Sequence, residues 1–386
     1  MTATVISNDE QLHWLALKLV PGLGTRRSGQ LVEHYRTPQA IFRASTSELE
    51  GSGVSGSVAR SIASGCTFED AVDQHQRMLD CGTTLIPITD PRYPPRLREI
   101  FDPPVVLFGR GRVELLQSLM LGIVGTRRPT PYGVAASERL SADLAQAGLT
   151  IASGMARGID TAAHKSALAA GGDTIAVFGC GVDNVYPAEN RKLADELAAK
   201  GLLLSEFAMG APAYPQNFPV RNRIISGMSA GVLVVEGAQY SGSSITAKMA
   251  LEQQREVFAV PGSIMSKMSW GPNLLIKQGA KLVQDWNDVV VELSPADRRT
   301  LIQKAQARQG ILGLDTTNDQ QTAAGELSPT SRKILNTLRP DTPIHLDELL
   351  ETFEPHSSSE LIAGLFELEM MGLARQLPGK NFVRVW

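Results

Sequence analysis

The stretch MLGIVGTRRPTPYGVAASERLSADLAQAGLTIASGMARGID, residues 120–160, decides the fold. It opens with an apolar run, Met120–Val124, and continues through a polar segment into a helical pattern over Val134–Ala147. A second apolar run, Thr150–Ala152, leads into another segment rich in glycine. The order strand, loop, helix, strand predicts a βαβ unit with two parallel strands.

The same alternation continues to about residue 293, so we expect one domain over residues 90–293. Its strands are nearly all apolar, which indicates burial of both faces and an α/β fold with a doubly wound, Rossmann-like parallel sheet. Further predicted strands are Thr174–Phe178, Leu202–Ser205, Val232–Val235 and Val257–Val260, and further predicted helices are Ile159–Ala170, Arg191–Ala199, Ile224–Ser229, Ser244–Gln253 and Asn273–Gln278.

Residues 1–89 show helical spacing of apolar residues and two turns rich in glycine, at 20–25 and 51–55. Such turns between short helices predict a helical domain of the helix-hairpin-helix (SAM-like) kind, which can bind a phosphate through backbone N–H groups. Acidic side chains outnumber basic ones there. We therefore favour the alternative that the glycines only form the turns.

Residues 294–328 are polar and predict a flexible linker. Three helical stretches and a β-ribbon follow, so residues 329–386 are expected to form a winged helix. The third stretch, Ser358–Met371, carries three glutamates and neither lysine nor arginine (Glu360, Glu367 and Glu369). This charge favours contact with a protein, or a regulatory role, over reading DNA.

Composition excludes several classes. The chain has 386 residues, a net charge of −3 and three cysteines without zinc-site spacing. We expect no metal, no cofactor, no signal peptide and no membrane span, and therefore a cytoplasmic protein. Bulk charge does not indicate a nucleic-acid binder, so any such activity would depend on a local patch.

Polar segments containing glycine, serine, threonine and arginine follow the predicted strands, at 125–130, 153–160, 179–183, 236–246 and 261–263. Because the carboxyl ends of parallel strands meet at one edge, these segments predict a single rim where ligands bind. Glycine allows close approach of the backbone, and the start of a helix offers N–H groups. The rim therefore predicts a site for phosphate-like anions.

The rim lacks both GxGxxG and GxxxxGK[ST], which argues against dinucleotide and Walker-type sites. It offers arginines instead, in a domain whose basic and acidic side chains balance: Arg127, Arg128, Arg157, Arg221 and Arg223. Guanidinium groups suit repeated phosphates and stack on bases. A local positive pocket of this kind fits a short stretch of phosphodiester backbone.

Arg221 and Arg223 diverge by about 200° if both are helical. We expect one to face the crevice and the other to form a structural ion pair. Asn222, between them, could cap the helix.

Catalysis has little support, and we predict no catalytic residue. His164 lies in a helical pattern with no nucleophile motif beside it, which favours a packed histidine. Asp160 is best explained as an acid in the first turn of a helix, where it complements the dipole. Glu236 could accept hydrogen bonds from a base amine or from the arginines.

The central span closely resembles the DNA-processing protein A family (DprA, also called Smf). The stretches that carry this resemblance are GTRRPTPYG at 125–133, SGMARGIDTAAHKSAL at 153–168, FPVRNRIISGMS at 218–229, VVEGAQYSGSSITA at 234–247, VPGS at 260–263 and GPNLLIKQGA at 271–280. The resemblance implies a DNA-binding protein of natural transformation (competence) that protects single-stranded DNA and loads the RecA recombinase. It further implies a homodimer and no catalytic activity.

Carried over by motif, Arg127 would hold phosphate, and the loops at 153–154 and 241–246 would present backbone and hydroxyl donors. With the rim residues, the predicted nucleic-acid site is Gly125, Thr126, Arg127, Ser153, Gly154, Arg157, Arg221, Asn222, Arg223, Glu236, Ser241, Gly242, Ser243, Thr246 and Lys248. One departure matters. Some members place a DNA-binding lysine after the Tyr-Pro pair, where this chain has Ala188 and Glu189.

Two alternatives stay open. One is an enzyme acting on a nucleotide or phosphoribosyl substrate, as in the phosphoribohydrolases called LOG proteins. Their PGGxGTxxE pattern is absent here, and no acid follows the 241–246 loop before Glu252. The other is a protein-only adaptor that uses its terminal domains, which leaves the collection of arginine and glycine on one rim unexplained.

Overall fold

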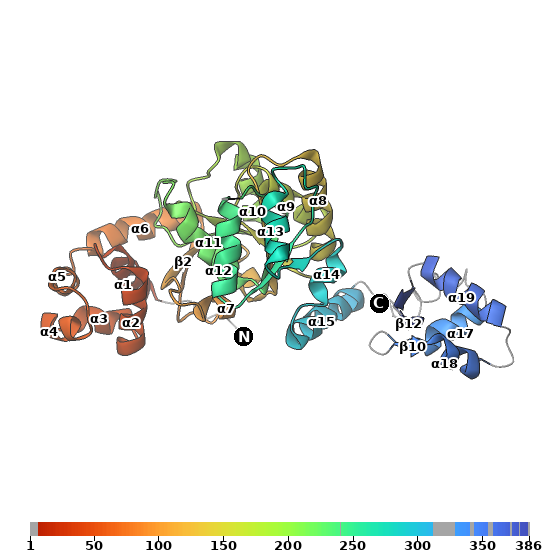
Figure 1. Cartoon of the computed structure of the whole chain (residues 1–386). Coiled ribbons are helices and arrows are strands. Elements are labelled where there is room, and N and C mark those ends of the chain that lie inside the picture. The colour runs from red at the N-terminus through yellow and green to blue at the C-terminus, as the bar shows by residue number, and fades with distance from the viewer. Residues whose placement is uncertain are drawn as a thin grey trace. The chain divides into compact units, whose positions relative to one another are not determined.

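The computed structural model describes residues 7–239, 241–311, 329–339, 343–353, 358–370, 373–377 and 379–384. They belong to two compact units that divide after Lys304. The first unit is built on a nine-stranded sheet with the spatial order β1-β2-β6-β5-β4-β3-β7-β8-β9 (Figure 1). Its strands are β1 (Thr83–Pro87), β2 (Val106–Gly111), β3 (Met120–Val124), β4 (Thr150–Ser153), β5 (Thr174–Phe178), β6 (Leu202–Ser205), β7 (Gly231–Val234), β8 (Glu256–Ala259) and β9 (Lys281–Leu282).

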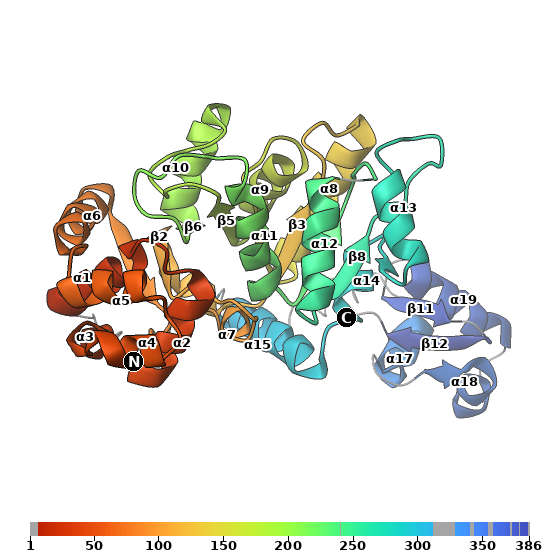
Figure 2. The same ribbon diagram turned by 60° about the vertical axis from the view of Figure 1, so that its left-hand side comes forward.

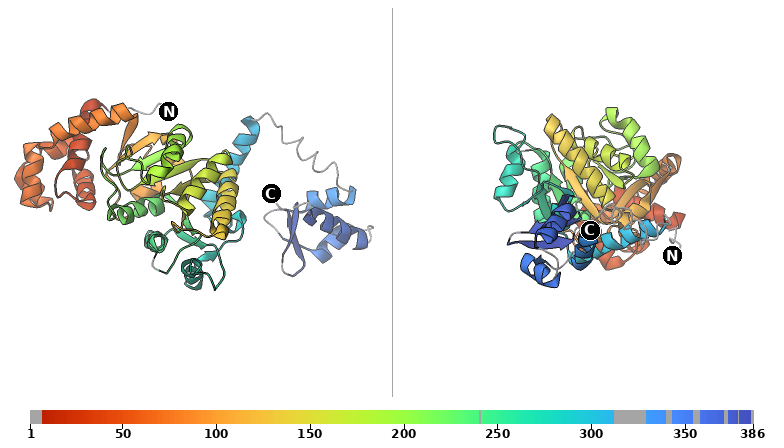
Figure 3. Two further views of the ribbon diagram at one scale, coloured as in Figure 1. Left: turned by 90° about the horizontal axis from the view of Figure 1, so that it is seen from above. Right: turned by 90° about the vertical axis from the view of Figure 1, so that its right-hand side faces the viewer.

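Helices cover both faces of this sheet, as Figure 2 and the right-hand view of Figure 3 show. One face packs against α7 (Pro95–Arg98), α11 (Asn217–Met228), α12 (Gly242–Glu252) and α13 (Trp270–Lys277). The other packs against α8 (Pro131–Gln146), α9 (Ile159–Ala169), α10 (Arg191–Lys200) and α14 (Trp286–Val290). Two 3₁₀ turns lie at Val113–Gln117 and Ala188–Asn190.

The burial of the strands explains their apolar sequences. Along β3, Leu121 and Ile123 join the core under α8 and α9, while Met120 and Val124 join the core under α11 and α12. Each side chain therefore finds an apolar layer whichever way it points. The doubly wound parallel sheet predicted from these runs is confirmed for β3 to β9.

The six predicted strands agree with the structure to within one residue at each end. The largest difference among the helices is α11, which begins at Asn217 rather than at the expected Ile224. Pro219 lies within the first helical turn, where proline is tolerated because its missing N–H has no partner to lose. Asn222 consequently lies inside the helix, and the expectation that it caps the helix is wrong.

Two strands at one edge were not predicted. β1 precedes residue 89, where the helical domain was expected to end, and β2 lies just beyond the proline-rich stretch that follows. β1 pairs antiparallel with β2, and β2 pairs antiparallel with β6. The parallel sheet therefore becomes mixed at this edge. Such pairing depends on residues distant in the sequence, which local pattern does not reveal.

The N-terminal helices are α1 (Asn8–Leu19), α2 (Thr25–Tyr35), α3 (Pro38–Arg43), α4 (Thr46–Gly51), α5 (Gly56–Ser64) and α6 (Phe68–Cys81). They gather at the β1 edge and share one apolar core with it, in which Trp14 and Phe108 are fully buried (Figure 1). The Gln74 side chain both donates to and accepts from the Met209 backbone. The helical part and the sheet thus form one packed unit.

Part of the expected linker is helical. α15 spans Pro295–Ile311, and its first turns pack against the sheet domain. Leu301 is buried, Asp297 bonds to Arg96 at 2.7 Å, and Lys304 lies 3.3 Å from Asp173. Residues 312–328 of that predicted linker lie outside the described residues.

The second unit is a winged helix, as predicted. It contains α17 (Pro329–Thr337), β10 (Ile344–His345), α18 (Leu346–Thr352), α19 (Ser358–Met370), β11 (Ala374–Leu377) and β12 (Asn381–Arg384), with the strand order β10-β12-β11. Its helices and ribbon share one core. Glu360 on α19 is exposed, and the Glu369 side chain lies outside the described residues. The role expected for this domain stays a prediction.

Within the described residues, no helix is both long enough and apolar enough to cross a membrane.

Gly111 ends β2 with a φ of +112°, and a Cβ there would lie 2.6 Å from the Gly201 carbonyl oxygen. Gly279 has a similar φ of +103°, but a Cβ added to it would meet nothing within 4 Å. We expect Gly111→Ala to lower the free energy of unfolding by about 1–3 kcal/mol more than Gly279→Ala, because only Gly111 adds a clash to the backbone strain. Urea denaturation of both variants measures this difference, and equal losses would contradict the close approach of β2 to α10.

Candidate nucleic-acid interface

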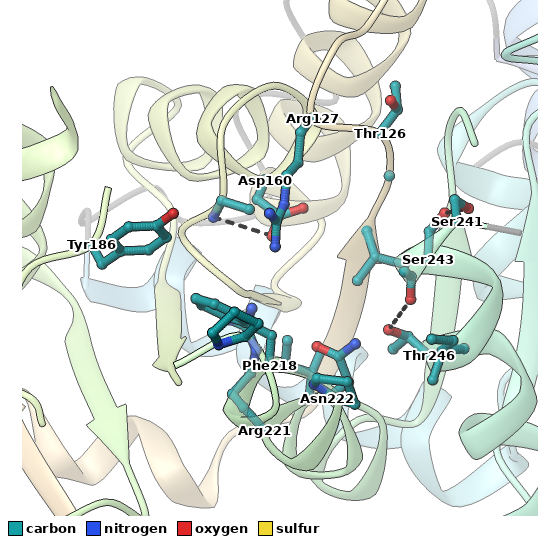
Figure 4. A pocket seen from close by; sticks show the side chains of 18 of the residues that line it. Thr126, Arg127, Asp160, Tyr186, Phe218, Arg221, Asn222, Ser241, Ser243 and Thr246 are labelled. Carbon is teal, nitrogen blue, oxygen red and sulfur yellow. Dashed lines mark hydrogen bonds between the residues drawn. The ribbon is translucent and has the colours of Figure 1, made fainter. Parts of the chain in front are cut away.

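The strand order reverses between β3 and β7, and in such sheets a crevice opens where the loops after these strands diverge. A cavity of about 500 Å³ lies there, with its side chains drawn in Figure 4. Its lining combines predicted rim residues with neighbours from three other segments: Val124, Gly125, Thr126, Arg127, Ala156, Asp160, Tyr186, Ala213, Pro215, Phe218, Pro219, Arg221, Asn222, Ile225, Ser241, Gly242, Ser243, Ile245 and Thr246.

The start of α12 forms one wall of the cavity. Ser241 caps this helix, and its hydroxyl accepts the N–H of Ser244. Gly242 and Ser243 follow in the first turn, where backbone N–H groups have no partner within the helix. Together with the positive end of the helix dipole, these groups are suited to a phosphate oxygen.

Arg127 brings an exposed positive charge to the cavity. It lies in the loop between β3 and α8, at the upper wall of the cavity in Figure 4. Among the described residues, no carboxylate is close enough to form an ion pair with it. Its guanidinium carbon lies 5.3 Å from the centre of the Phe218 ring. The charge is therefore held over an aromatic face, with the Asp160 carboxylate beside it but beyond ion-pair distance.

Two aromatic side chains of the cavity were missing from the predicted site. The Tyr186 and Phe218 rings lie 5.5 Å apart at an angle of 38°, and Tyr186 is 47% exposed. Tyr186 belongs to the Tyr-Pro pair that precedes Ala188, and Phe218 opens the stretch 218–229 that contains the two helical arginines. An exposed aromatic ring beside an arginine is typical of surfaces that bind single-stranded nucleic acid. The two rings come together only because the loop after β5 meets the first turn of α11.

Arg221 lies at the cavity, as the resemblance implied, and its hydrogen bonds run to the backbone of the sheet. It lines the cavity but is 96% buried, and its Nη1 donates to the carbonyl oxygens of Gly154, at 2.6 Å, and Val177. Burial lowers its pKa to about 10, so it stays protonated at neutral pH. Its donors hold the ends of β4 and β5 together. Its place in the predicted nucleic-acid site stays a prediction.

Asp160 lies at the first turn of α9, as predicted, and is 94% buried. Its Oδ2 accepts the backbone N–H groups of Gly154 at 3.1 Å and Ala156 at 3.3 Å. Burial raises the pKa of this carboxyl, and the neighbouring Arg221 and Arg127 oppose that rise.

Glu236 anchors the arginine loop. Its carboxylate accepts the Thr130 backbone N–H at 2.9 Å and the Thr130 hydroxyl at 2.6 Å, and its carbonyl oxygen accepts the Thr126 N–H. Among the described residues, Glu236 holds Thr130 and not a rim arginine, so that expected contact is wrong, while the contact to a base amine stays a prediction. Glu236 therefore positions the loop that carries Arg127.

Three other predicted cations, Arg157, Arg223 and Lys248, are paired with carboxylates, whereas exposed Arg128 has none within ion-pair distance among the described residues. Arg223 is buried against Glu206 and lies 3.2 Å from Asp102, so the prediction that one of the two helical arginines forms a structural ion pair is confirmed. It faces a second cavity and does not belong to the site. Arg157 lies 2.7 Å from Glu189, the residue that stands near the lysine position of some relatives.

Lys248 lies 3.8 Å from Glu252 and outside the cavity lining. The Ser153 hydroxyl is also turned away, since it donates to the Ile123 carbonyl at 2.6 Å. Gly154 and Arg157 line a small hollow that adjoins the main cavity at Arg127, Tyr186 and Phe218. The structure thus brings together most of the predicted residues and places Ser153, Arg223, Glu236 and Lys248 elsewhere.

His164 is packed, as its sequence context favoured. It is fully buried, its Nδ1 lies 2.7 Å from the Thr174 hydroxyl, and burial lowers its pKa to about 3. Within the described part of the chain, no group of three or more His, Cys, Asp or Glu side chains is placed to hold a metal ion.

Two family models match this chain. The model for DNA recombination-mediator protein A matches residues 84–294, and the model for the DprA winged helix domain matches residues 318–380. The Smf protein of Synechocystis is 34% identical and covers 98% of this chain and all of its own length. The DNA processing protein DprA of Bacillus subtilis is 47% identical over 55% of this chain and 72% of its own.

Two solved structures are also similar. DprA from Streptococcus pneumoniae has 35% identity and a TM-score of 0.66, covering 73% of this chain and 98% of its own. DNA processing protein A from Helicobacter pylori, whose structure describes a single-stranded DNA binding mode, has 31% identity, a TM-score of 0.50 and coverage of 55% and 97%. With a family model over more than half of its length and a full-length relative, the chain belongs to the DNA recombination-mediator protein A (DprA/Smf) family.

Proposed function

We propose that this protein binds single-stranded DNA in the β3–β7 cavity and acts, without catalysis, as a recombination mediator. In this role it protects incoming single strands during natural transformation and loads RecA onto them. One observation carries the proposal. Arg127, with no carboxylate partner among the described residues, faces a cavity between an aromatic pair and a helix N-terminus.

A single strand supplies partners for each of these groups. A phosphate lies between Arg127 and the first-turn N–H groups of α12, where charge and donors converge. The adjacent base lies against the Tyr186 and Phe218 rings, since stacking on an aromatic face accepts any base. The adjoining hollow at Gly154 and Arg157 extends the path along the strand. Duplex DNA buries its base faces within the helical stack and cannot offer them to these rings.

The contacts of the acidic groups support a role without catalysis. Glu236 is engaged by Thr130, and one Asp160 oxygen is engaged by two backbone N–H groups. Among the residues that the structure describes, neither carboxylate is hydrogen-bonded to a histidine or a cysteine with which it could transfer a proton. The alternative of a nucleotide or phosphoribosyl enzyme has no observation in its favour.

A homodimer is also part of the proposal. Several large apolar side chains are exposed near the β8 and β9 end of the sheet, among them Ile264 at 92% and Met265 at 88%. Apolar groups this exposed favour burial against another surface. Light scattering after size exclusion measures the mass of the full chain in solution. A monomer at micromolar concentration would contradict the proposed homodimer.

Arg127→Gln is expected to weaken binding of a labelled oligo(dT) about tenfold, because it removes a phosphate contact. The slope of log K against log salt should become shallower by about 0.7. Fluorescence anisotropy at several salt concentrations measures both effects. Arg139→Gln, at an exposed arginine on α8 outside the cavity, is the matched control and should leave both unchanged. Equal affinities for the two variants would contradict a phosphate site at Arg127.

Tyr186→Leu is expected to weaken binding by about 1–3 kcal/mol, since it removes a stacking surface without altering charge. Its effect should be the same at low and high salt, unlike that of Arg127→Gln. Phe101→Leu is the control, because this 76% exposed ring lies at the second cavity. A loss confined to low salt would exclude stacking as the cause.

RecA loading has a direct test. On single strands covered by a single-strand binding protein, the wild type should shorten the lag before RecA hydrolyses ATP, and Arg127→Gln should not. Arg139→Gln should behave as the wild type. If both variants shorten the lag equally, the DNA site is not required for loading, and that part of the proposal fails.

A further inference from the structure

The two oxygens of the Asp160 carboxylate have different surroundings. Oδ2 accepts the N–H groups of Gly154 and Ala156. Oδ1 has no hydrogen-bond donor among the described residues. It is also not one of the fully buried polar atoms that lack a partner, so it keeps some accessible surface. Asp160 lines the cavity with the 6% of its surface that remains accessible, and Figure 4 shows it beside Arg127. One acceptor oxygen is therefore open to the ligand site.

Charge decides what can occupy the space next to this oxygen. A phosphate beside a carboxylate in a half-enclosed cavity is repelled. The N–H groups at the start of α12 favour a phosphate elsewhere in the cavity, and Arg127, although it stands beside Asp160, forms no ion pair or hydrogen bond with it among the described residues. The group that faces Oδ1 is therefore a neutral hydrogen-bond donor, and on a DNA strand neutral N–H donors belong to the bases.

We propose that Asp160 Oδ1 accepts an N–H from the Watson–Crick edge of one unpaired base held in the cavity. This inference rests on the proposed single-strand function and adds the group that the site recognises. Every DNA base carries such an N–H: N1 and N2 of guanine, N6 of adenine, N4 of cytosine and N3 of thymine. In a duplex these groups are engaged in base pairs. One acceptor therefore selects for an unpaired base without selecting a sequence.

The surroundings of Asp160 suit a fixed acceptor. The carboxylate stands in the first turn of α9, and the two N–H donors hold one oxygen in place. Gly154, which provides one donor, is itself fixed through its carbonyl by the buried Arg221. An acceptor that is already oriented loses little freedom when a base arrives.

The test uses short strands that are abasic except at one position, so that phosphate number and charge are constant. The single base is thymine, uracil or N3-methylthymine. Thymine and uracil both keep the N3–H and differ only at C5, whereas N3-methylthymine lacks the N–H. With the wild type, anisotropy should give equal affinity for thymine and uracil and about tenfold weaker binding of N3-methylthymine.

Asp160→Asn then identifies the acceptor. The asparagine oxygen can still accept from Gly154 and Ala156, while an NH₂ group replaces Oδ1 in the cavity. Since the methyl group also adds bulk, the decisive quantity is the ratio of the two affinities. We expect that ratio to fall from about ten to about one in the variant, and a thermal melt confirms that the variant is folded.

Each outcome has one meaning. Equal wild-type binding of thymine and N3-methylthymine overturns the inference and leaves single-strand binding intact. A tenfold ratio that persists in Asp160→Asn also overturns it, because the discrimination is then steric. If the wild type fails to bind even unmodified oligo(dT), the proposed function itself is wrong.

Discussion

A single buried guanidinium organises the cavity. Arg221 reaches from α11 to the ends of two neighbouring strands and donates to the carbonyl oxygens of Gly154 and Val177. Carbonyl groups at strand ends have lost their sheet partners, and a buried cation without partners is costly. Here the guanidinium gives the carbonyl oxygens a donor, and the carbonyl oxygens give the buried cation its acceptors. The Gly154 turn is thereby fixed, and with it the N–H that orients Asp160.

Close packing reinforces this arrangement. A side chain on Gly154 would collide with the Arg221 guanidinium, and a Cβ on Gly125 would lie 2.5 Å from Ile159. These glycines allow one strand end to approach a helix and another to approach a cation. Glu236 supports the loop after β3 by hydrogen bonds. Its carboxylate holds Thr130 and thereby fixes the loop that carries Arg127. The cavity is therefore held in shape by residues whose hydrogen bonds and close contacts lie within the protein.

The arginines of the rim divide by their partners. Arg157 and Arg223 have carboxylates within ion-pair distance, and Arg221 has carbonyl oxygens. The Arg127 guanidinium lies over the face of the Phe218 ring. A charge already paired with a carboxylate gains little from a phosphate, while one held over a ring keeps most of its attraction for an anion. This difference leaves an exposed positive charge at the proposed site of a domain whose charges otherwise balance.

The sequence by itself determined the order of strands and helices, because apolar runs buried on both faces have a pattern that no solvent-facing strand shares. It also determined which edge of the sheet holds the candidate site, since the carboxyl ends of parallel strands must meet. It could not assign roles to neighbouring polar residues. Arg221 and Arg127 look alike in the chain, and only their tertiary surroundings made one structural and left the other to face the ligand. Tertiary structure likewise decided the pairing of β1 with β2 and the contact of Tyr186 with Phe218. Each joins two segments, and the local sequence of one segment does not indicate which other segment it will contact.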